Sequence, residues 1–244
     1  MKLFPCNPPP SELRNLSGYA SCDCFRPLGD SAAKWTELEF HDDVMPADSP
    51  AAAQLEQLIR LTVERGSESF VPRNELGGEL WSQIKRLPAS IGLMNRVTRM
   101  DLYASHLVAI PREIMLMTSL VNFDPYTSYR LHWLPYELAR CPALRTSRIS
   151  TRALYGNRNY RPPFPRLPNA SVSSEVCSIC DGNIERGKAV QRWISLLVAT
   201  DVVPLLVNAC SGSCLDRLPA PPPGCAARAH KGGVGSRPPK LPSS

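Results

Sequence analysis

The sequence predicts an α/β fold: a short repeat solenoid with a helical cap before it and a small β-hairpin and helix module after it. Three observations lead to this expectation. Apolar residues recur with a fixed period between residues 74 and 168, a well-capped helix precedes them, and two cysteine pairs follow them. One unit of such a repeat cannot bury its own apolar row, so the units are expected to stack.

Composition sets the frame for these elements. The chain has 244 residues, which suits one or two domains, and 43% of them are apolar, near the average for soluble proteins. Collagen, a coiled coil and disorder throughout are therefore excluded. The first ten residues carry prolines where a secretory signal needs an apolar run. Residues 193–210 are too interrupted by polar residues and proline for a membrane span, so we expect a cytoplasmic protein without membrane contact.

Residues 49–73 are predicted to form the helical cap. Ser49 suits the N-cap position, Pro50 the first helical position, and Gly66 the position after the last turn. The apolar residues that fall on one face of this helix are Leu55, Leu58, Ile59 and Val63. Residues 1–48, before the helix, are predicted to be irregular, with scattered apolar anchors at Trp35, Leu38 and Phe40.

The segment 74–168 carries the repeat. A Leu-Pro or Ile-Pro pair recurs at steps of 23 and 24 residues, at Leu87, Ile110 and Leu134. The apolar positions that follow each pair are Ile91 and Met94, then Ile114 and Met117, then Leu138 and Cys141. Those upstream of the second pair, Val97, Met100, Leu102 and Leu107, shift by one repeat to Leu120, Phe123, Pro125 and Leu131. This is the L-x-x-L-x-L pattern of a leucine-rich repeat, in which a short strand, a turn and a return segment form each unit.

Two cysteine pairs characterise the module predicted at residues 169–218. Cys177 and Cys180 form a Cys-x-x-Cys pair, and Cys210 and Cys214 lie four residues apart. Between them, residues 190–199 and 203–207 have strand character and predict a β-hairpin. A short helix beginning near Ala209 would place the second pair on one face. Together these elements resemble a treble-clef zinc finger, and four thiolates suit a closed, structural zinc site.

Two other interpretations of the thiols stay open. The four cysteines could be buried thiols without a metal, or one thiol, at Cys214 or Cys141, could serve a thiol-dependent enzyme, of the ligase type in the case of Cys214. We expect no enzyme, because no hydrolase or zinc-protease motif is present and four sulfurs leave no open metal position. The last residues, 219–244, are rich in proline, glycine and basic residues and are predicted to be disordered.

Two surfaces are candidates for binding. Seven arginines and no acidic residue lie between residues 138 and 174, at Arg140, Arg145, Arg148, Arg152, Arg158, Arg161 and Arg166. They could attract nucleic acid, but no nucleic-acid motif accompanies them, which favours an acidic protein or plain solvation. The second surface is the concave face, where strand residues that alternate with buried ones would align. Its predicted partner-binding residues are Arg99, Asp101, Tyr103, Asn122, Asp124, Tyr126 and Arg148.

Four stretches are similar to a family of bacterial leucine-rich repeat proteins with a C-terminal four-cysteine module: LYASHL (102–107), YTSYRLHWLPYEL (126–138), STRALYGN (150–157) and WISLLVATDVVPLLVNAC (193–210). The resemblance implies a fold and a repeat class, and it implies no reaction. The sequence therefore predicts a non-enzymatic scaffold that binds an unidentified protein partner through its concave face and contains a structural zinc ion.

Overall fold

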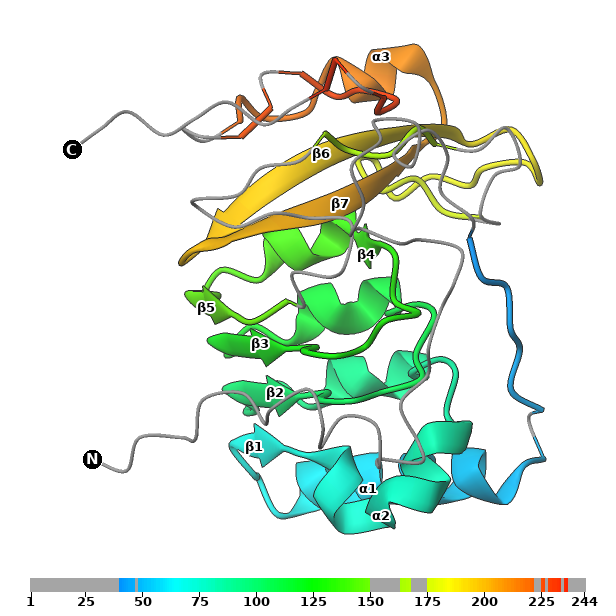
Figure 1. Cartoon of the computed structure of the whole chain (residues 1–244), viewed down its shortest axis with the longest axis vertical. Helices are drawn as coiled ribbons and strands as arrows, with labels where there is room; N and C mark the ends of the chain where they lie inside the picture. The colour runs from blue at the N-terminus through cyan, green and yellow to red at the C-terminus, as the bar shows by residue number, and fades with distance from the viewer. Residues whose placement is uncertain are drawn as a thin grey trace, which may run out of the picture.

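The computed structural model is a mixed α/β structure in which two N-terminal helices, a parallel sheet and a hairpin follow one another along one axis (Figure 1). The helices lie at one end and the hairpin near the other. The residues that the structure describes are 40–46, 48–149, 163–167, 175–221, 225–226, 228–233 and 235–236. Among these, every helix is too short or too polar to cross a lipid bilayer.

The first end of the stack is closed by α1 (Pro50–Glu64) and α2 (Pro72–Gln83). The Ser49 hydroxyl accepts a hydrogen bond from the Ala52 amide at 3.1 Å, so the predicted N-cap is present. One face of α1 is buried, while α2 contributes the fully buried Trp81, whose indole donates to the Tyr103 carbonyl at 3.2 Å. The helices thus cover the apolar side of the first strands.

A four-stranded parallel sheet follows, in the order β1-β2-β3-β5. Its strands are β1 (Ser69–Phe70), β2 (Arg99–Asp101), β3 (Asn122–Asp124) and β5 (Thr146–Ser147). The first strand, β1, lies before residue 74, where the predicted repeat segment begins, so the sheet starts earlier than the sequence indicated. Each of β2 and β3 leads into a turn whose central residue, Ala104 or Thr127, has a positive φ. The chain therefore turns in the same way in both units.

Three 3-10 helices form the opposite side of these units: η2 (Ala89–Leu93), η3 (Arg112–Leu116) and η4 (Tyr136–Arg140). A proline precedes each of them, because its fixed φ suits the residue before a helix and it needs no amide partner there. Inside the turns, the Ser105 hydroxyl donates to the Ser128 hydroxyl at 2.7 Å, and Ser128 donates to the Leu102 carbonyl at 3.1 Å. These buried hydroxyls link one unit to the next.

The hairpin consists of β6 (Val190–Val198) and β7 (Asp201–Ala209), joined by a turn at Ala199 and Thr200. The predicted hairpin is therefore present, with its turn one residue earlier than expected. β7 also pairs in parallel with β4 (Leu134–Pro135), which gives a second, mixed sheet in the order β4-β7-β6. The Asp201 carboxylate accepts hydrogen bonds from the Ile149 amide at 2.7 Å and the Ser147 hydroxyl at 3.2 Å. The hairpin turn is thus fastened to the last strand of the parallel sheet.

A single apolar core runs from the first helix to the hairpin. Ile59 of α1, Phe123 of β3 and Val203 of β7 belong to the same buried cluster. The residues at the predicted repeat positions are buried in it, among them Ile91, Met94, Val97, Met100, Leu102, Leu107, Ile114, Met117, Leu120, Leu131, Leu138 and Cys141. The apolar period of the sequence therefore corresponds to the buried side of the units.

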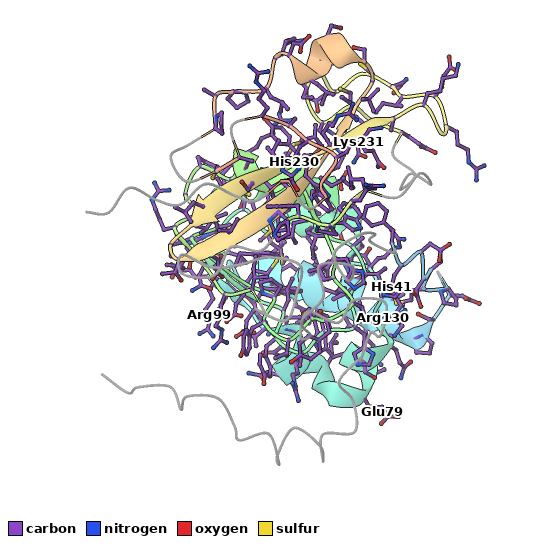
Figure 2. All side chains as sticks on the ribbon, turned by 45° about the horizontal axis from the view of Figure 1, so that its top comes forward. His41, Glu79, Arg99, Arg130, His230 and Lys231 are labelled. Carbon is purple, nitrogen blue, oxygen red and sulfur yellow. The ribbon has the colours of Figure 1, made fainter. Side chains whose placement is uncertain are left out.

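The N-terminal segment 40–46 runs along the side of the stack away from the parallel strands (Figure 1). Phe40 packs edge-on against Trp133, with ring centroids 6.3 Å apart, so the predicted anchoring at Phe40 is confirmed. The Asp43 carboxylate pairs with the Arg130 guanidinium at 2.7 Å. Figure 2 shows His41 beside Arg130 on one side of the molecule and Arg99 on the other. Trp35 and Leu38 lie outside the described residues.

Residues 228–233, part of the segment 219–244 predicted to be disordered, lie against β6 and residues 164–167. His230 forms two backbone hydrogen bonds with Trp193 of β6, at 2.7 and 3.0 Å. The amide of Leu167 donates to the Lys231 carbonyl at 2.8 Å. Gly232 has a φ of +79°, and a Cβ there would lie 1.8 Å from the Pro165 carbonyl oxygen. A high glycine content was one reason to predict disorder, but here Gly232 allows its backbone to approach the backbone of Pro165 closely.

His230 makes the folded state sensitive to acid. Burial lowers the pKa of its imidazole from 6.5 to about 4. Above pH 6.5 the ring is neutral in both the folded and the unfolded chain. Between pH 6.5 and 4 only the unfolded chain binds the proton, so the free energy of unfolding decreases as the pH is lowered. We expect the free energy of unfolding to be lower by about 2 kcal/mol at pH 4 than at pH 7. The full pKa shift would give a larger loss, but the ring is partly exposed and solvent screens part of the effect. Urea unfolding of the protein and of a His230→Asn variant at pH 7, 5 and 4 checks this, and equal pH slopes would contradict it.

Candidate metal centre and candidate binding face

Four cysteine side chains meet in one cluster beyond the hairpin. Their sulfur atoms all lie within 4.8 Å of one another, and none of them is in a disulfide. Cys177 and Cys214 are buried, whereas Cys180 and Cys210 are more exposed. The two pairs that the sequence singled out are therefore brought together, and their four sulfurs could hold a metal ion.

A tight backbone turn presents the first pair. The Cys177 amide donates to the Gly182 carbonyl at 2.8 Å, and the Asp181 amide donates to the Cys177 carbonyl at 3.1 Å. Asp181 itself has a φ of +57°, a conformation that aspartate adopts more easily than most residues. A Cβ at Gly182 would lie 3.2 Å from the Cys180 sulfur, so glycine leaves room for the thiol. We call residues 177–183 the cysteine turn.

The second pair is presented by the end of the hairpin and a short helix. Cys210 follows the last residue of β7, and Cys214 lies in α3 (Gly212–Leu215). The Ser211 hydroxyl caps this helix by accepting from the Cys214 amide at 3.3 Å. The helix thus begins at Gly212 rather than near Ala209, because β7 continues through Ala209 and Ser211 supplies the N-cap.

The sulfur geometry fits a tetrahedral metal site. The Cys210 sulfur lies 3.5 Å from the Cys214 sulfur and 3.8 Å from the Cys180 sulfur. Four sulfurs at about 2.3 Å from a central zinc-like ion are about 3.8 Å apart, whereas a disulfide requires about 2.05 Å. A closed set of four sulfurs leaves no position for a reacting water, so an ion bound here would act on stability.

The thiols also differ in how readily they ionise. Burial opposes ionisation of Cys177, but the amides of Cys180, Ile179 and Cys210 direct hydrogen bonds to its sulfur and lower its pKa to about 6. The neighbouring Cys210 sulfur, with burial, raises the pKa of Cys214 to about 12. Without a cation, these shifts favour a thiolate at Cys177 and a protonated thiol at Cys214. A divalent cation at the centre would stabilise all four thiolates together.

An ion-pair network that sequence reasoning missed joins the cysteine turn to the repeating units. Asp181 pairs with Arg112 of η3 and, at 3.4 Å, with Arg140 of η4. The hydrogen bond from Arg112 and the charges of both arginines lower the pKa of Asp181, although slight burial opposes this. Glu137, which is buried beside Arg112 at 3.6 Å, also receives a hydrogen bond from Ser178. The sequence signal was present only as an aspartate after Cys180 and one arginine after each of the last two proline pairs.

The strands of the parallel sheet align the residues predicted for the second surface. Asn122 of β3 lies opposite Arg99 on one side and Thr146 on the other, and Asp101 lies opposite Asp124. We call the surface formed by Arg73, Arg99, Asp101, Tyr103, Asn122, Asp124, Tyr126 and Arg148 the strand face.

Two tyrosines and two arginines form a column on the strand face. The rings of Tyr103 and Tyr126 are stacked, with centroids 6.1 Å apart and an angle of 20° between their planes. Arg73 lies over Tyr103 at 5.4 Å and Arg148 over Tyr126 at 4.8 Å. Arg73 was not predicted, because it comes from α2 and not from a repeat position.

Both aspartates of the strand face are occupied by groups of this chain. Asp101 and Asp124 each accept a hydrogen bond at 3.1 Å, from the amides of Tyr103 and Tyr126 respectively. This side chain-to-backbone bond fixes the turn after each strand. The same arrangement in two successive units explains why the two tyrosines are stacked.

The remaining oxygens of these aspartates pair with arginines. Arg99 lies 2.8 Å from Asp101, and Arg148 lies 2.7 Å from Asp124. The arginine side chains stay 45% and 55% exposed, whereas the aspartate side chains are only 13% and 10% exposed. The carboxylates are therefore covered, and the guanidinium groups form the outer layer.

The described arginines of the predicted 140–166 belt are largely bound within the chain. Arg140 pairs with Asp181, Arg148 pairs with Asp124, and Arg145 donates to two backbone carbonyls at 3.0 and 2.9 Å. Arg152, Arg158 and Arg161 lie outside the described residues. Arg166, the remaining described arginine of the belt, is exposed.

Cys141, the other thiol considered for chemistry, is buried in the apolar core. Its sulfur donates to the Ile114 carbonyl at 3.2 Å, and burial raises its pKa to about 11. Such a thiol is protonated at neutral pH and reacts slowly.

No protein-family model, curated protein or solved structure matches this chain.

Proposed function

We propose that this protein is a non-enzymatic scaffold of the leucine-rich repeat class, which binds a protein partner through the strand face. Support for the repeat class comes from the parallel strands, the 3-10 helices after each Leu-Pro or Ile-Pro pair, and the identical turns at Ala104 and Thr127. Stacked repeats expose a row of strand residues that is well suited to binding extended partners.

The observation that carries the proposal is the column of Tyr103 and Tyr126 between Arg73 and Arg148. Tyrosine and arginine are the residue types that contribute most to protein–protein binding. The contacts within the column hold the side chains in place before a partner arrives, which lowers the entropic cost of binding.

The four cysteines are proposed to bind one zinc ion with a structural role. The all-sulfur ligand set and the sulfur–sulfur distances support zinc in tetrahedral geometry. In a cytoplasmic protein such an ion replaces the disulfides that a secreted domain would use. It would fix the cysteine turn and α3 at the end of the hairpin, and the reactivity of Cys214 as a nucleophile would be lost.

Peptides selected from a random display library on the immobilised protein test the binding proposal. Replacing Tyr103 and Tyr126 together by alanine is expected to weaken selected peptides about 30-fold or more, since hot-spot side chains contribute at least about 2 kcal/mol. A Tyr136→Ala variant, altered outside the strand face, serves as the matched control. Peptides that bind the double variant as tightly as the unchanged protein would contradict the proposal, provided that urea unfolding shows both to be folded.

A further inference from the structure

We infer that the partner segment bound by the strand face is acidic, an extended stretch of a protein rich in Asp and Glu. This inference rests on the proposed function. The charges that a partner would meet decide this. The outermost groups of the strand face are the guanidinium groups of Arg99 and Arg148, which are about half exposed. A partner approaching the sheet therefore contacts positive charge first.

The acidic residues of the strand face do not cancel this charge for a partner. Each aspartate accepts from a backbone amide and from an arginine, Asp124 through both of its oxygens to Arg148, and little of either side chain is exposed. Each guanidinium has five N–H donors. Arg99 uses its Nη2 on one oxygen of Asp101, and Arg148 uses Nε and Nη2 on the two oxygens of Asp124. The donors that remain can bind carboxylates of a second chain with charge-assisted hydrogen bonds. The net charge of +6 adds long-range attraction for an acidic partner.

The aromatic rings favour a protein segment over a single-stranded nucleic acid. Nucleic acids bind such surfaces by stacking bases on free aromatic faces. Here Tyr103 and Tyr126 stack on each other, Arg73 lies over the first ring and Arg148 over the second. Each ring therefore already has an aromatic neighbour and an arginine packed on it. A base would have to displace these contacts, whereas carboxylates can bind the arginines in place.

The partner is inferred to be extended because the two outer arginines lie on different strands of one sheet: Arg99 is in β2 and Arg148 follows β5, with β3 between them. Arg99, Asn122 and Thr146 occupy equivalent places on successive parallel strands, and Arg148 lies in the neighbouring row. Adjacent strands are about 4.8 Å apart. An extended chain presents alternate side chains to the same side, so acidic residues at every second position would all face the sheet.

Fluorescence anisotropy with three labelled probes tests the inference on the full chain: a peptide that alternates Glu and Ser, the same peptide with Gln for Glu, and an oligothymidylate of equal charge. We expect the Glu peptide to bind at least tenfold more tightly than the Gln peptide and the oligothymidylate. Substituting Arg99→Gln and Arg148→Gln together should weaken the Glu peptide at least tenfold, as expected for hydrogen bonds to charged groups. Arg99→Gln alone leaves the Arg148–Asp124 pair in place and should weaken it less.

The matched control replaces two exposed arginines elsewhere, Arg60 in α1 and Arg186 after the cysteine turn, by glutamine. It removes the same net charge and should leave the affinity for the Glu peptide nearly unchanged. Equal loss in both double variants, equal binding of the Glu and Gln peptides, or tighter binding of the oligothymidylate would each overturn the inference. If display-selected peptides depend on Tyr103 and Tyr126 but are not acidic, the inference fails and the proposed function stands. If no peptide depends on the tyrosines, the proposed function fails as well.

Discussion

Substituting Cys210 by serine is expected to abolish binding of the proposed zinc ion and to lower the free energy of unfolding by about 4 kcal/mol or more, the range in which loss of a metal site falls. The Cys210 sulfur lies close to both the Cys180 and Cys214 sulfurs, so its removal opens the cluster. Three thiolates would then be left without the ion that stabilises them together.

Metal content by mass spectrometry and urea unfolding measure this result. The protein as purified should contain about one zinc per chain, and treatment with a chelator should reproduce the stability of the variant. Cys141→Ser is the matched control: Cys141 is buried in the core away from the cluster, so that variant should keep the metal. A Cys210→Ser protein with unchanged metal content, or an unmodified protein without metal, would refute the structural zinc site and return attention to thiol chemistry.

The second large effect is expected from Trp193→Ala. Trp193 is fully buried, its indole donates to the Pro165 carbonyl at 3.0 Å, and its backbone pairs with His230. Phe40 and Phe164 pack on its ring, with centroids 6.5 and 5.9 Å away. The change should cost about 3–5 kcal/mol, because it leaves a large cavity where four segments meet. Trp193→Phe keeps most of the packing and should cost about 1–2 kcal/mol, mainly through the lost hydrogen bond.

Hydrogen exchange distinguishes this local role from a general loss of stability. In Trp193→Ala the amides of residues 228–233 should exchange much faster, because their contacts with β6 are lost. Trp81 is equally buried but lies at the other end of the stack, so Trp81→Ala should destabilise the protein to a similar degree without that local change. Equal protection of residues 228–233 in both variants would show that Trp193 does not hold this segment.

Elements with a strong local signal could be predicted from the sequence. The N-cap at Ser49 and the two runs of strand character beside the hairpin turn are local, and both predict elements that the structure contains. The buried repeat positions follow the apolar period because each unit places the same side of its chain in the core. The four cysteines were found because their spacing is itself a chemical signature.

Contacts between distant segments left no such signal. The pairing of Leu134 with Leu205 depends on how the hairpin meets the last unit, and nothing near either residue encodes it. Arg73 joins the strand face from α2, where a helix pattern says nothing about the sheet. The segment around His230 has few apolar side chains, and its composition therefore predicted disorder. It is held by backbone hydrogen bonds to Trp193, which leave no signal in the composition.

The pairing of β4 with β7 also has a consequence during protein synthesis. When the ribosome has added Ser147, the last residue of the parallel sheet, the hairpin that completes the core has not yet been synthesised. The ribosome must still add the 62 residues from Arg148 to Ala209, the end of β7, which takes roughly 3–12 seconds at about 5–20 residues per second. During that interval Leu134 and Leu138 face water in the nascent chain. Slower translation of this stretch lengthens the time in which neighbouring nascent chains can associate, so synthesis speed here affects the yield of native protein.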